Sequence, residues 1–290
     1  MPELPEVETI RRGLNKFIIH SKLCQNKILC PKSFIGTPQT GQVISIRRFG
    51  KALVLDLDNH HSLMIHLRMT GQLIYDPDSD TPNTHQNRYA AGHPSDNFTA
   101  TLPNKQTRVI LKFDHGTLYF NDQRKFGFIK VIKTDEVEKD SFIKKLAKEP
   151  WDMKPDEFYE KLQKHKNSSV KATILDQTVI CGLGNIYADE SLFATKIHPE
   201  QKAGSITRKK AEQLLIEARK VMDKSIDSGG STMATYVKAD GTKGDYLEKF
   251  AQVFRRENQP CPKCGQKIVK IKVAGRGTHI CPNCQRKSND

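Results

Sequence analysis

The chain has 290 residues, enough for two domains with a substantial apolar core. Lysine and arginine number 47 against 33 acidic residues, giving a net charge of +14. This excess favours a polyanionic partner, nucleic acid before an anionic membrane surface. No apolar run approaches the ~20 residues of a membrane-spanning helix, and the acidic N-terminus lacks the pattern of a secretory leader. We therefore expect a cytoplasmic protein with no membrane partner.

The N-terminus predicts a helix with an unusual start. Val7, Ile10, Leu14 and Phe17 recur at helical spacing, so one face can be buried. If Met1 is removed, as a small second residue normally allows, Pro2 becomes a terminal secondary amine beside Glu3. Such an amine can attack a carbonyl carbon and form a Schiff base, and a neighbouring carboxyl can move protons. Composition alone favours the simpler alternative that these Pro-Glu repeats merely start a helix.

Residues 40–132 are predicted to be mostly strands. Short apolar segments lie at 52–57, 62–69, 108–113, 117–121 and 126–132, and Asp114-His115-Gly116 is a hairpin signal. Several short strands behind one helix indicate an antiparallel β-sandwich. Between residues 76 and 104 the composition turns to Asp, Pro, Asn, Thr and Gly, which predicts a long surface loop.

The character of the chain changes after residue 133. Helical periods are predicted at 136–148, 155–165, 170–177 and 207–226. Gly182-Leu183-Gly184-Asn185 lies between two of these helices. Asn185 can cap the following helix, whose free N–H groups would suit a phosphate. A plain glycine turn is an equally good interpretation of this motif alone.

Four cysteines at the C-terminal end have the spacing of a zinc site. Cys261 and Cys264 form one Cys-x-x-Cys pair, and Cys281 and Cys284 form the second after sixteen residues. Four thiolates predict one closed, structural zinc ion. The intervening residues include Lys267, Lys270, Lys272 and Arg276, so we expect a hairpin with a basic tip.

Taken in order, these motifs resemble the formamidopyrimidine-DNA glycosylase (Fpg/Nei) family. The resemblance is carried by Pro-Glu-Leu-Pro-Glu-Val-Glu at 2–8, His-Leu-Arg-Met-Thr-Gly at 66–71, Asp-Gln-Arg-Lys-Phe-Gly at 122–127, the Gly-Leu-Gly-Asn turn and the zinc finger. It implies an α+β fold. The expected parts are an N-terminal helix with a catalytic antiparallel β-sandwich at 1–135, a linker at 136–150, a helix–two-turn–helix domain at 151–256 and a four-cysteine zinc-finger hairpin at 257–287.

The resemblance also implies catalytic roles. Pro2 would attack the sugar of a damaged nucleotide, and Glu3 would transfer protons there with support from Glu6. Lys51 would act in proton transfer and phosphate contact. Arg276 would hold a phosphate and serve δ-elimination.

Further residues match DNA contacts of the family. Met69, Arg124 and Phe126 would fill the space left by the extruded base, which offsets the few kcal/mol that extrusion costs. Lys125 and Asn185 would contact the DNA backbone. Gln106 stands where the family often has a DNA-contacting histidine, which leaves that contact without charge. Lys166 and Tyr236 complete the expected DNA-binding set, with Tyr236 in a segment at 231–244 that would cover the extruded base.

The resemblance therefore implies a bifunctional DNA glycosylase and AP lyase of base excision repair. It would act as a monomer in the bacterial cytoplasm, associated with the nucleoid, remove 8-oxoguanine and formamidopyrimidines from duplex DNA, and cut the strand by β,δ-elimination. One alternative is an endonuclease VIII-like glycosylase for oxidised pyrimidines, against which Leu4 and the Glu-Val-Glu that follows argue. A second alternative is a non-enzymatic zinc-ribbon DNA-binding protein, which has no need of the Pro2-Glu3 pair.

Overall fold

The computed structural model describes residues 2–78, 88–92, 100–231 and 246–287. The chain forms two compact units, Met1–Lys144 with Ser228–Asp245, and Lys145–Asp227 with Tyr246–Asp290. It thus returns to the first unit at Ser228, within the stretch that the sequence assigned to the helical domain. Most of the segment predicted to cover an extruded base, including Tyr236, lies outside the described residues.

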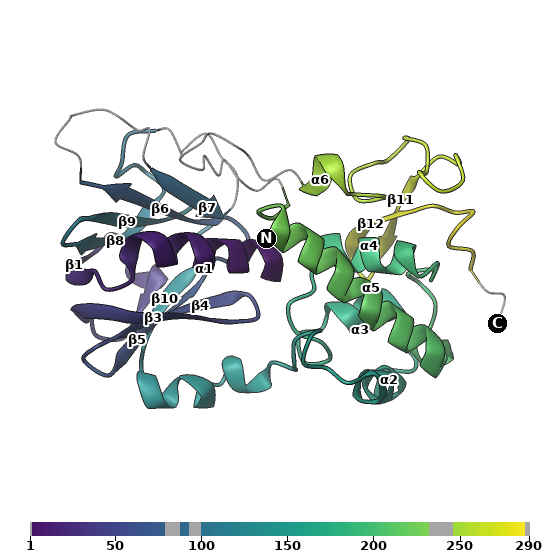
Figure 1. The fold of residues 1–290 in the computed structure, drawn as a ribbon, viewed down its shortest axis with the longest axis horizontal. Coiled ribbons are helices and arrows are strands. Elements are labelled where there is room, and N and C mark those ends of the chain that lie inside the picture. Colours follow the sequence, from purple (N-terminus) through teal and green to yellow (C-terminus); the bar gives the residue numbers. More distant parts are fainter. Residues whose placement is uncertain (1, 79–87, 93–99, 232–245, 288–290) are drawn as a thin grey trace. The chain divides into compact units, whose positions relative to one another are not determined.

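The first unit combines one helix with a mainly antiparallel sheet (Figure 1). The helix α1 spans Leu4–Ile18. Ten strands are described: β1 Lys22–Ile28, β2 Phe34–Ile35, β3 Gly41–Phe49, β4 Ala52–Leu57, β5 His61–His66, β6 Gly71–Pro77, β7 Tyr89–Gly92, β8 Thr107–Phe113, β9 Gly116–Asp122 and β10 Phe128–Lys133. Their order is β2-β10-β5-β4-β3-β1-β8-β9-β6-β7, with a parallel pair only between β2 and β10. The predicted helix, the predicted antiparallel sheet and the α+β class are confirmed.

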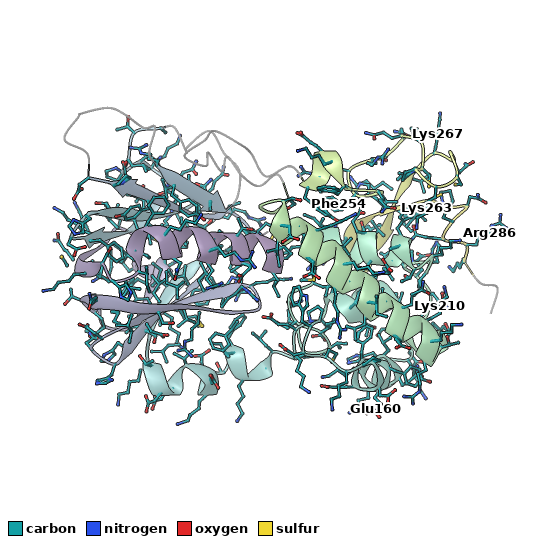
Figure 2. The ribbon with its side chains drawn as sticks, in the orientation of Figure 1. Glu160, Lys210, Phe254, Lys263, Lys267 and Arg286 are labelled. Atoms are coloured by element: carbon teal, nitrogen blue, oxygen red, sulfur yellow. The ribbon has the colours of Figure 1, made fainter. Side chains whose placement is uncertain are left out.

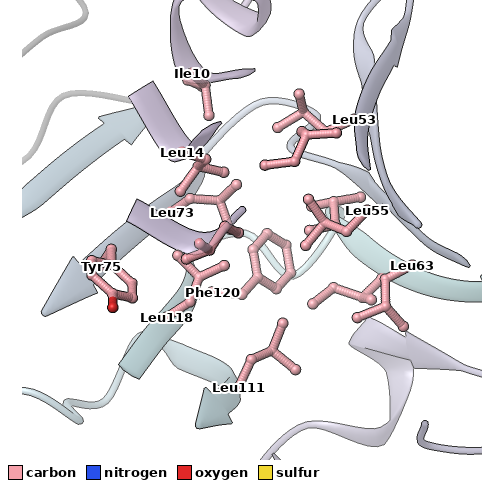
Figure 3. Packing of buried hydrophobic residues seen from close by; sticks show 14 of the residues in the cluster. Ile10, Leu14, Leu53, Leu55, Leu63, Leu73, Tyr75, Leu111, Leu118 and Phe120 are labelled. Atoms are coloured by element: carbon pink, nitrogen blue, oxygen red, sulfur yellow. The ribbon is translucent and has the colours of Figure 1, made fainter. Parts of the chain in front are cut away.

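The apolar core of this unit lies between the two halves of the sheet. Leu53, Leu55 and Leu63 come from β4 and β5, and they pack against Leu73 and Phe120 from β6 and β9 (Figure 3). These side chains are fully buried. Their alternation along each strand places every second residue inside, and α1 adds its own apolar face to the same cluster. The helix and both halves of the sheet therefore share one large apolar cluster.

The predicted helix at 136–148 is wrong. The chain instead forms two 3-10 turns, η4 at Thr134–Lys139 and η5 at Ile143–Lys145. Asp140 breaks the helix between them, because one of its carboxylate oxygens accepts from the Phe142 N–H (2.9 Å) and the other pairs with Lys130 (2.5 Å). Side-chain bonds of this kind compete with the helical ladder. The turns still bury Val137 and Ile143, on a second small cluster with Ala52, Val54 and Met64.

The predicted surface loop at 76–104 is also wrong in part, because it contains β7. The four residues of β7 pair with β6 and are buried. The Tyr89 hydroxyl donates to the carbonyl oxygens of Thr9 and Ile10 on α1, at 3.3 Å each. Gly13 makes this contact possible, since a Cβ atom there would lie 2.1 Å from the Tyr89 hydroxyl oxygen. A four-residue strand of Tyr, Ala and Gly has too weak a pattern to be detected from sequence.

The second unit is helical and ends in a hairpin. Its helices are α2 Pro155–Lys164, α3 Val170–Leu175, α4 Asn185–Ala194, α5 Arg208–Asp227 and α6 Tyr246–Lys249, with a 3-10 turn η6 at Ala203–Ser205. The strands β11 Val269–Val273 and β12 Arg276–Ile280 form the antiparallel hairpin. These elements confirm the predicted helices at 155–165, 170–177 and 207–226 to within two residues at each end. Within the described ranges, no helix has both the length and the hydropathy to span a membrane.

The contact between Gly13 and Tyr89 gives a test of how α1 is held. Gly13→Ala should lower the free energy of unfolding by at least ~1–3 kcal/mol, because overpacking a filled core forces side chains out of their rotamers. Urea unfolding measures this difference. Asn15→Ala, on the exposed face of the same helix, is the control. The double variant Gly13→Ala with Tyr89→Leu should lose less than the sum of the single variants, whereas strict additivity would contradict the contact.

Candidate functional site

The N-terminus of α1 is fixed by a reciprocal cap. Glu3 is the N-cap residue of the helix, and Glu6 stands three residues later in a capping box. The Glu6 carboxylate accepts from the Glu3 backbone N–H at 2.8 Å. Pro5 occupies the first turn, where a missing N–H has no cost. Pro2 and Glu3 are both buried, so the start of the chain is held inside the first unit.

The second oxygen of the Glu6 carboxylate binds a distant segment of the same unit. It accepts from the backbone N–H of Ser231 at 2.9 Å and from the Ser231 hydroxyl at 2.8 Å. Both residues are buried. One carboxylate therefore ties the start of α1 to residue 231, where the predicted covering segment begins. The sequence suggested a supporting role for Glu6 but not this partner.

A chain of contacts leads from α1 to the turn that carries Lys51. The Arg48 guanidinium donates to Glu8 at 3.0 Å and to the carbonyl oxygen of Gly50 at 3.2 Å. Gly50 has φ +56°, a conformation that glycine adopts without strain. Lys51 follows and is only 7% exposed, so it is not a solvated turn residue. Its burial requires the turn to be well positioned.

Glu8 is the anchor of this chain of contacts. Burial alone would raise its pKa, but hydrogen bonds from Arg11, Arg48 and Arg12 outweigh that effect and lower the pKa of Glu8 to about 2. The N–O distances lie between 2.8 and 3.0 Å. Glu8 is thus ionised throughout the neutral range and holds Arg48 against the Lys51 turn.

Three loops place the predicted DNA-contacting side chains of the first unit. Met69 lies in the turn after β5, Gln106 in the loop before β8, and Arg124, Lys125 and Phe126 in the turn after β9. Met69 is 38% exposed and Phe126 is 55% exposed, so neither belongs to the core. The Arg124 guanidinium stacks on the Phe126 ring at 4.8 Å. Strands predicted at 62–69 and 126–132 are consequently shorter, since these residues form turns.

Asp122, which sequence reasoning missed, connects these loops. Its carboxylate accepts from the Thr70 hydroxyl, from the Arg124 N–H (3.1 Å) and from the Gly127 N–H (2.7 Å). Its carbonyl oxygen accepts from the Arg108 guanidinium at 2.7 Å. Asp122 is fully buried. An aspartate that bonds to the backbone N–H two residues later is a common turn signal, so this part of its role was open to prediction from Asp-Gln-Arg-Lys-Phe-Gly.

His66 helps to shape the Met69 turn from the end of β5. Its Nδ1 atom accepts from the Arg68 N–H at 3.0 Å, and Arg68 has a left-handed backbone with φ +50°. Burial, with smaller effects from the nearby charges of Arg68 and Lys51, lowers the pKa of His66 to about 3. The imidazole is therefore neutral near pH 7 and can accept this bond.

In the second unit, the Gly-Leu-Gly-Asn turn differs from the prediction. Gly184 is the N-cap of α4 and Asn185 is the first helical residue, so the prediction that Asn185 caps the helix is wrong. The tight turn leaves the cap position to glycine, and the Asn185 amide instead donates to the carbonyl oxygen of Gly277 at 2.9 Å. The side chain thus links the start of α4 to the zinc hairpin.

A buried ion pair fastens the same hairpin to the helices. Lys171 on α3 pairs with Asp189 on α4 at 2.6 Å, and neither side chain is exposed. Lys171 also donates to the Thr278 hydroxyl at 2.7 Å, and Asp189 accepts from the His279 N–H at 2.9 Å. These partners satisfy charges that would otherwise be costly to bury. They hold β12, whose first residue is the exposed Arg276.

The four cysteines lie together as a metal site requires. Their Sγ atoms all fall within 4.8 Å of one another. The distances are 3.9 Å between Cys261 and Cys284 and 3.4 Å between Cys264 and Cys281. Tetrahedral zinc–thiolate bonds of ~2.3 Å imply sulfur separations of about 3.8 Å, so the cluster fits one structural zinc ion. Lys263, Lys267 and Arg286 lie on this zinc-binding segment (Figure 2) and are exposed.

Comparisons with known proteins find the same family along nearly the whole chain. The model of the formamidopyrimidine-DNA glycosylase N-terminal domain matches residues 1–129, and that of the glycosylase's H2TH domain matches 146–237. A zinc finger found in FPG and IleRS matches 258–286. The formamidopyrimidine-DNA glycosylase of Pelotomaculum thermopropionicum is 36% identical over 296 residues, covering 99% of both chains. That of Streptococcus pyogenes is 37% identical over 302 residues, again covering 99% of both.

Solved structures show the same likeness. Lactococcus lactis Fpg, bound non-covalently to DNA containing an AP site, has a TM-score of 0.82 at 33% identity. MutM in complex with DNA containing carbocyclic 8-oxo-G has a TM-score of 0.83 at 34% identity. Each alignment covers 99% of this chain and 100% of the other. A β-sandwich led by one helix, an H2TH segment and a four-cysteine zinc finger together define a class of DNA glycosylases. The chain belongs to the formamidopyrimidine-DNA glycosylase family.

Of the remaining predicted residues, Lys166 lies exposed in the loop between α2 and α3. Its carbonyl oxygen accepts from the Gly204 N–H at 3.2 Å. A Cβ atom at Gly204 would lie 2.6 Å from the Lys166 Cβ, so the loop packs tightly around this lysine. Its part in DNA binding stays a prediction.

The arginine cluster around Glu8 predicts a pH dependence. Because the pKa of Glu8 is about 2 in the folded protein against an ordinary 4.5, its ion pairs stabilise the fold fully above pH 4.5. That contribution is lost as the pH falls towards 2. Glu8→Gln should therefore lower the free energy of unfolding by ~1.5–3 kcal/mol at pH 7, and the difference from the parent protein should shrink between pH 4.5 and 2. Urea unfolding at several pH values measures it.

The control for this measurement is Glu136→Gln, an exposed acid of the same unit, which should change stability little at any pH. A difference between the parent protein and Glu8→Gln that stayed constant from pH 7 to pH 2 would contradict the assigned ion pairs.

The cysteine cluster predicts one zinc ion for each chain. Cys261→Ser should reduce the zinc content to near zero by elemental analysis and make residues 257–287 sensitive to protease, since a small metal site and its fold are coupled. Cys24→Ser, at an exposed cysteine outside the cluster, should keep both properties. Retention of one equivalent of zinc by the Cys261→Ser variant would contradict the four-thiolate site.

Proposed function

We propose that this chain is a DNA glycosylase and AP lyase of base excision repair that removes oxidised purines from duplex DNA and then cuts the strand. Family membership over the whole length supports the activity class. The observation that carries the proposal is the buried, hydrogen-bonded N-terminus. A chain end is normally poorly ordered, and the Glu6 carboxylate here fixes Glu3 and the start of α1.

In the proposed reaction, the nitrogen of a terminal Pro2 attacks C1′ of the damaged nucleotide. The glycosidic bond breaks, and the base leaves with a proton. The sugar ring opens to a Schiff base with Pro2, which acidifies the C2′ proton. Loss of that proton expels the 3′ phosphate, and a second elimination expels the 5′ phosphate. Glu3 is the nearest carboxyl in sequence and is assigned the proton transfers at the sugar.

The expected DNA contacts divide between backbone and base stack. Lys51, Lys125, Asn185 and Arg276 are proposed to contact phosphates, which position the protein without reading sequence. Met69, Arg124 and Phe126 are proposed to enter the stack where the damaged base leaves. Met69 and Phe126 are exposed on turns that the hydrogen bonds of Asp122 hold in place, which supports this role. Zinc, when bound, holds the hairpin that carries Arg276 and takes no part in the chemistry.

The purine preference is the finer part of this proposal. The MutM structure with 8-oxo-G analogue DNA supports it. A further Lactococcus lactis Fpg structure is of a complex with DNA containing an oxidised pyrimidine, which supports the alternative substrate class. Incision of matched duplexes that carry 8-oxoguanine or thymine glycol distinguishes the two. A rate higher on thymine glycol would overturn the purine assignment, and incision of neither would overturn the enzyme assignment.

We also propose that the protein acts as a monomer in the bacterial cytoplasm, associated with the nucleoid. The net charge of +14 supports association with DNA. Light scattering of the free protein tests the monomer, since a mass near twice 32.9 kDa would contradict it.

The role of Pro2 predicts that activity requires its free amine. A form that keeps one residue ahead of Pro2 turns the amine into an amide, whose nitrogen cannot attack C1′. This form should still bind lesion duplex, because the proposed phosphate contacts come from other residues and position the protein without the Pro2 nitrogen, but it should not incise it. Gel-shift binding and incision assays on the same duplex measure the two properties. Incision at the rate of the processed protein would show that Pro2 is not the nucleophile.

A further inference from the structure

Thr70 and Asp122 join two turns that are far apart in the sequence. The Thr70 hydroxyl donates to the Asp122 carboxylate and accepts from the Arg124 N–H at 3.0 Å. The same carboxylate oxygen also accepts from the Arg124 N–H at 3.1 Å. Met69 immediately precedes Thr70, and Phe126 lies two residues after Arg124. The hydroxyl is therefore a bridge between the Met69 turn and the Arg124–Phe126 turn.

Each of these turns has a backbone conformation that needs support. Arg68 has φ +50° and Lys125 has φ +59°, and a non-glycine residue in this region carries backbone strain. Glycines close both turns. A Cβ atom at Gly71 would lie 2.4 Å from the Leu67 carbonyl oxygen, and one at Gly127 would lie 2.8 Å from the Phe120 ring. The strained turns persist because buried partners hold them.

The bridge has the chemistry of a strong positioning contact. Asp122 is fully buried, and removing one partner of a buried hydrogen bond leaves the other partner unsatisfied. Its other oxygen is engaged by the Gly127 N–H at 2.7 Å, so the carboxylate cannot rotate freely. The exposed side chains Met69 and Phe126 are thereby presented on a single rigid support.

We propose that Thr70 is a positioning residue that makes the Met69 turn and the Arg124–Phe126 turn enter the base stack as one unit. This inference rests on the proposed function. Extruding a base costs a few kcal/mol, and groups held in the bound geometry lose less entropy when they fill the gap. The bridge therefore acts on base extrusion. An abasic site in single-stranded DNA has no base to extrude and no duplex stack to fill, so the bridge should not affect cutting there.

Thr70→Val tests this, because valine keeps the shape of threonine and removes both hydrogen bonds. Incision of a lesion in duplex DNA should fall about tenfold, the equivalent of ~1.4 kcal/mol. Cutting of an abasic site in single-stranded DNA should stay within about twofold of the parent rate, as expected for a bridge that acts only on the stack. Thr70→Ser, which keeps the hydroxyl, should restore duplex incision. The fluorescence of a 2-aminopurine base placed beside the lesion reports unstacking. Its rise should be slower with Thr70→Val than with the parent protein or with Thr70→Ser.

Three results would overturn the inference. Thr70→Val could incise lesion duplex like the parent protein, it could lose both activities equally, or Thr70→Ser could be as impaired as Thr70→Val. If Thr70→Val folds poorly, Thr70→Ala replaces it, since alanine also removes both hydrogen bonds and adds no atoms, and it should show the same selective loss of duplex incision. Failure of the parent protein to incise any lesion would instead overturn the proposed function, and this inference with it.

Discussion

The first unit depends on the hydrogen bonds of one carboxylate, that of Glu6. A terminal amine can act as a nucleophile only if the end of the chain is held in place, and chain ends usually fray. Glu6 holds the end of the chain through both of its carboxylate oxygens. One oxygen binds the Glu3 N–H, and the other binds both polar groups of Ser231. The start of α1 and the segment at residue 231 are thus fixed by a single side chain, 225 residues apart in sequence.

The same kind of contact, a buried carboxylate that accepts from backbone N–H groups, recurs elsewhere in this basic protein. Asp122 gathers the Arg124 and Gly127 N–H groups, and Asp189 binds the His279 N–H. Glu190 on α4 accepts from three successive N–H groups, those of residues 252–254, at 2.8–3.0 Å. Burial nevertheless raises the pKa of Glu190. Buried acids therefore hold turns and the β12 strand in place, while the excess of lysine and arginine stays largely at the surface for a polyanion.

The sequence predicted those features whose signal is local. Helical periodicity found α1, α2 and α5, and the cysteine spacing found the metal cluster. The failures have physical causes that a local pattern does not contain. The Asp140 carboxylate accepts from the Phe142 N–H and so interrupts the helix predicted at 136–148. Strand β7 is stabilised by the packing of its Tyr89 side chain against α1 at Gly13. The Glu8–Arg48 pair and the Thr70–Asp122 bridge join residues 40 and 52 positions apart, so only the folded chain reveals them.

The central claim is that the fixed terminal amine of Pro2 performs the chemistry, supported by Glu3 and by the positioned Lys51. Borohydride reduction during the reaction with lesion duplex converts a Schiff base into a stable protein–DNA adduct, and peptide mapping then identifies the attached residue. The account predicts an adduct on the peptide that begins with Pro2. An adduct on the peptide that contains Lys51, the buried amine of the neighbouring β3–β4 turn, would contradict it.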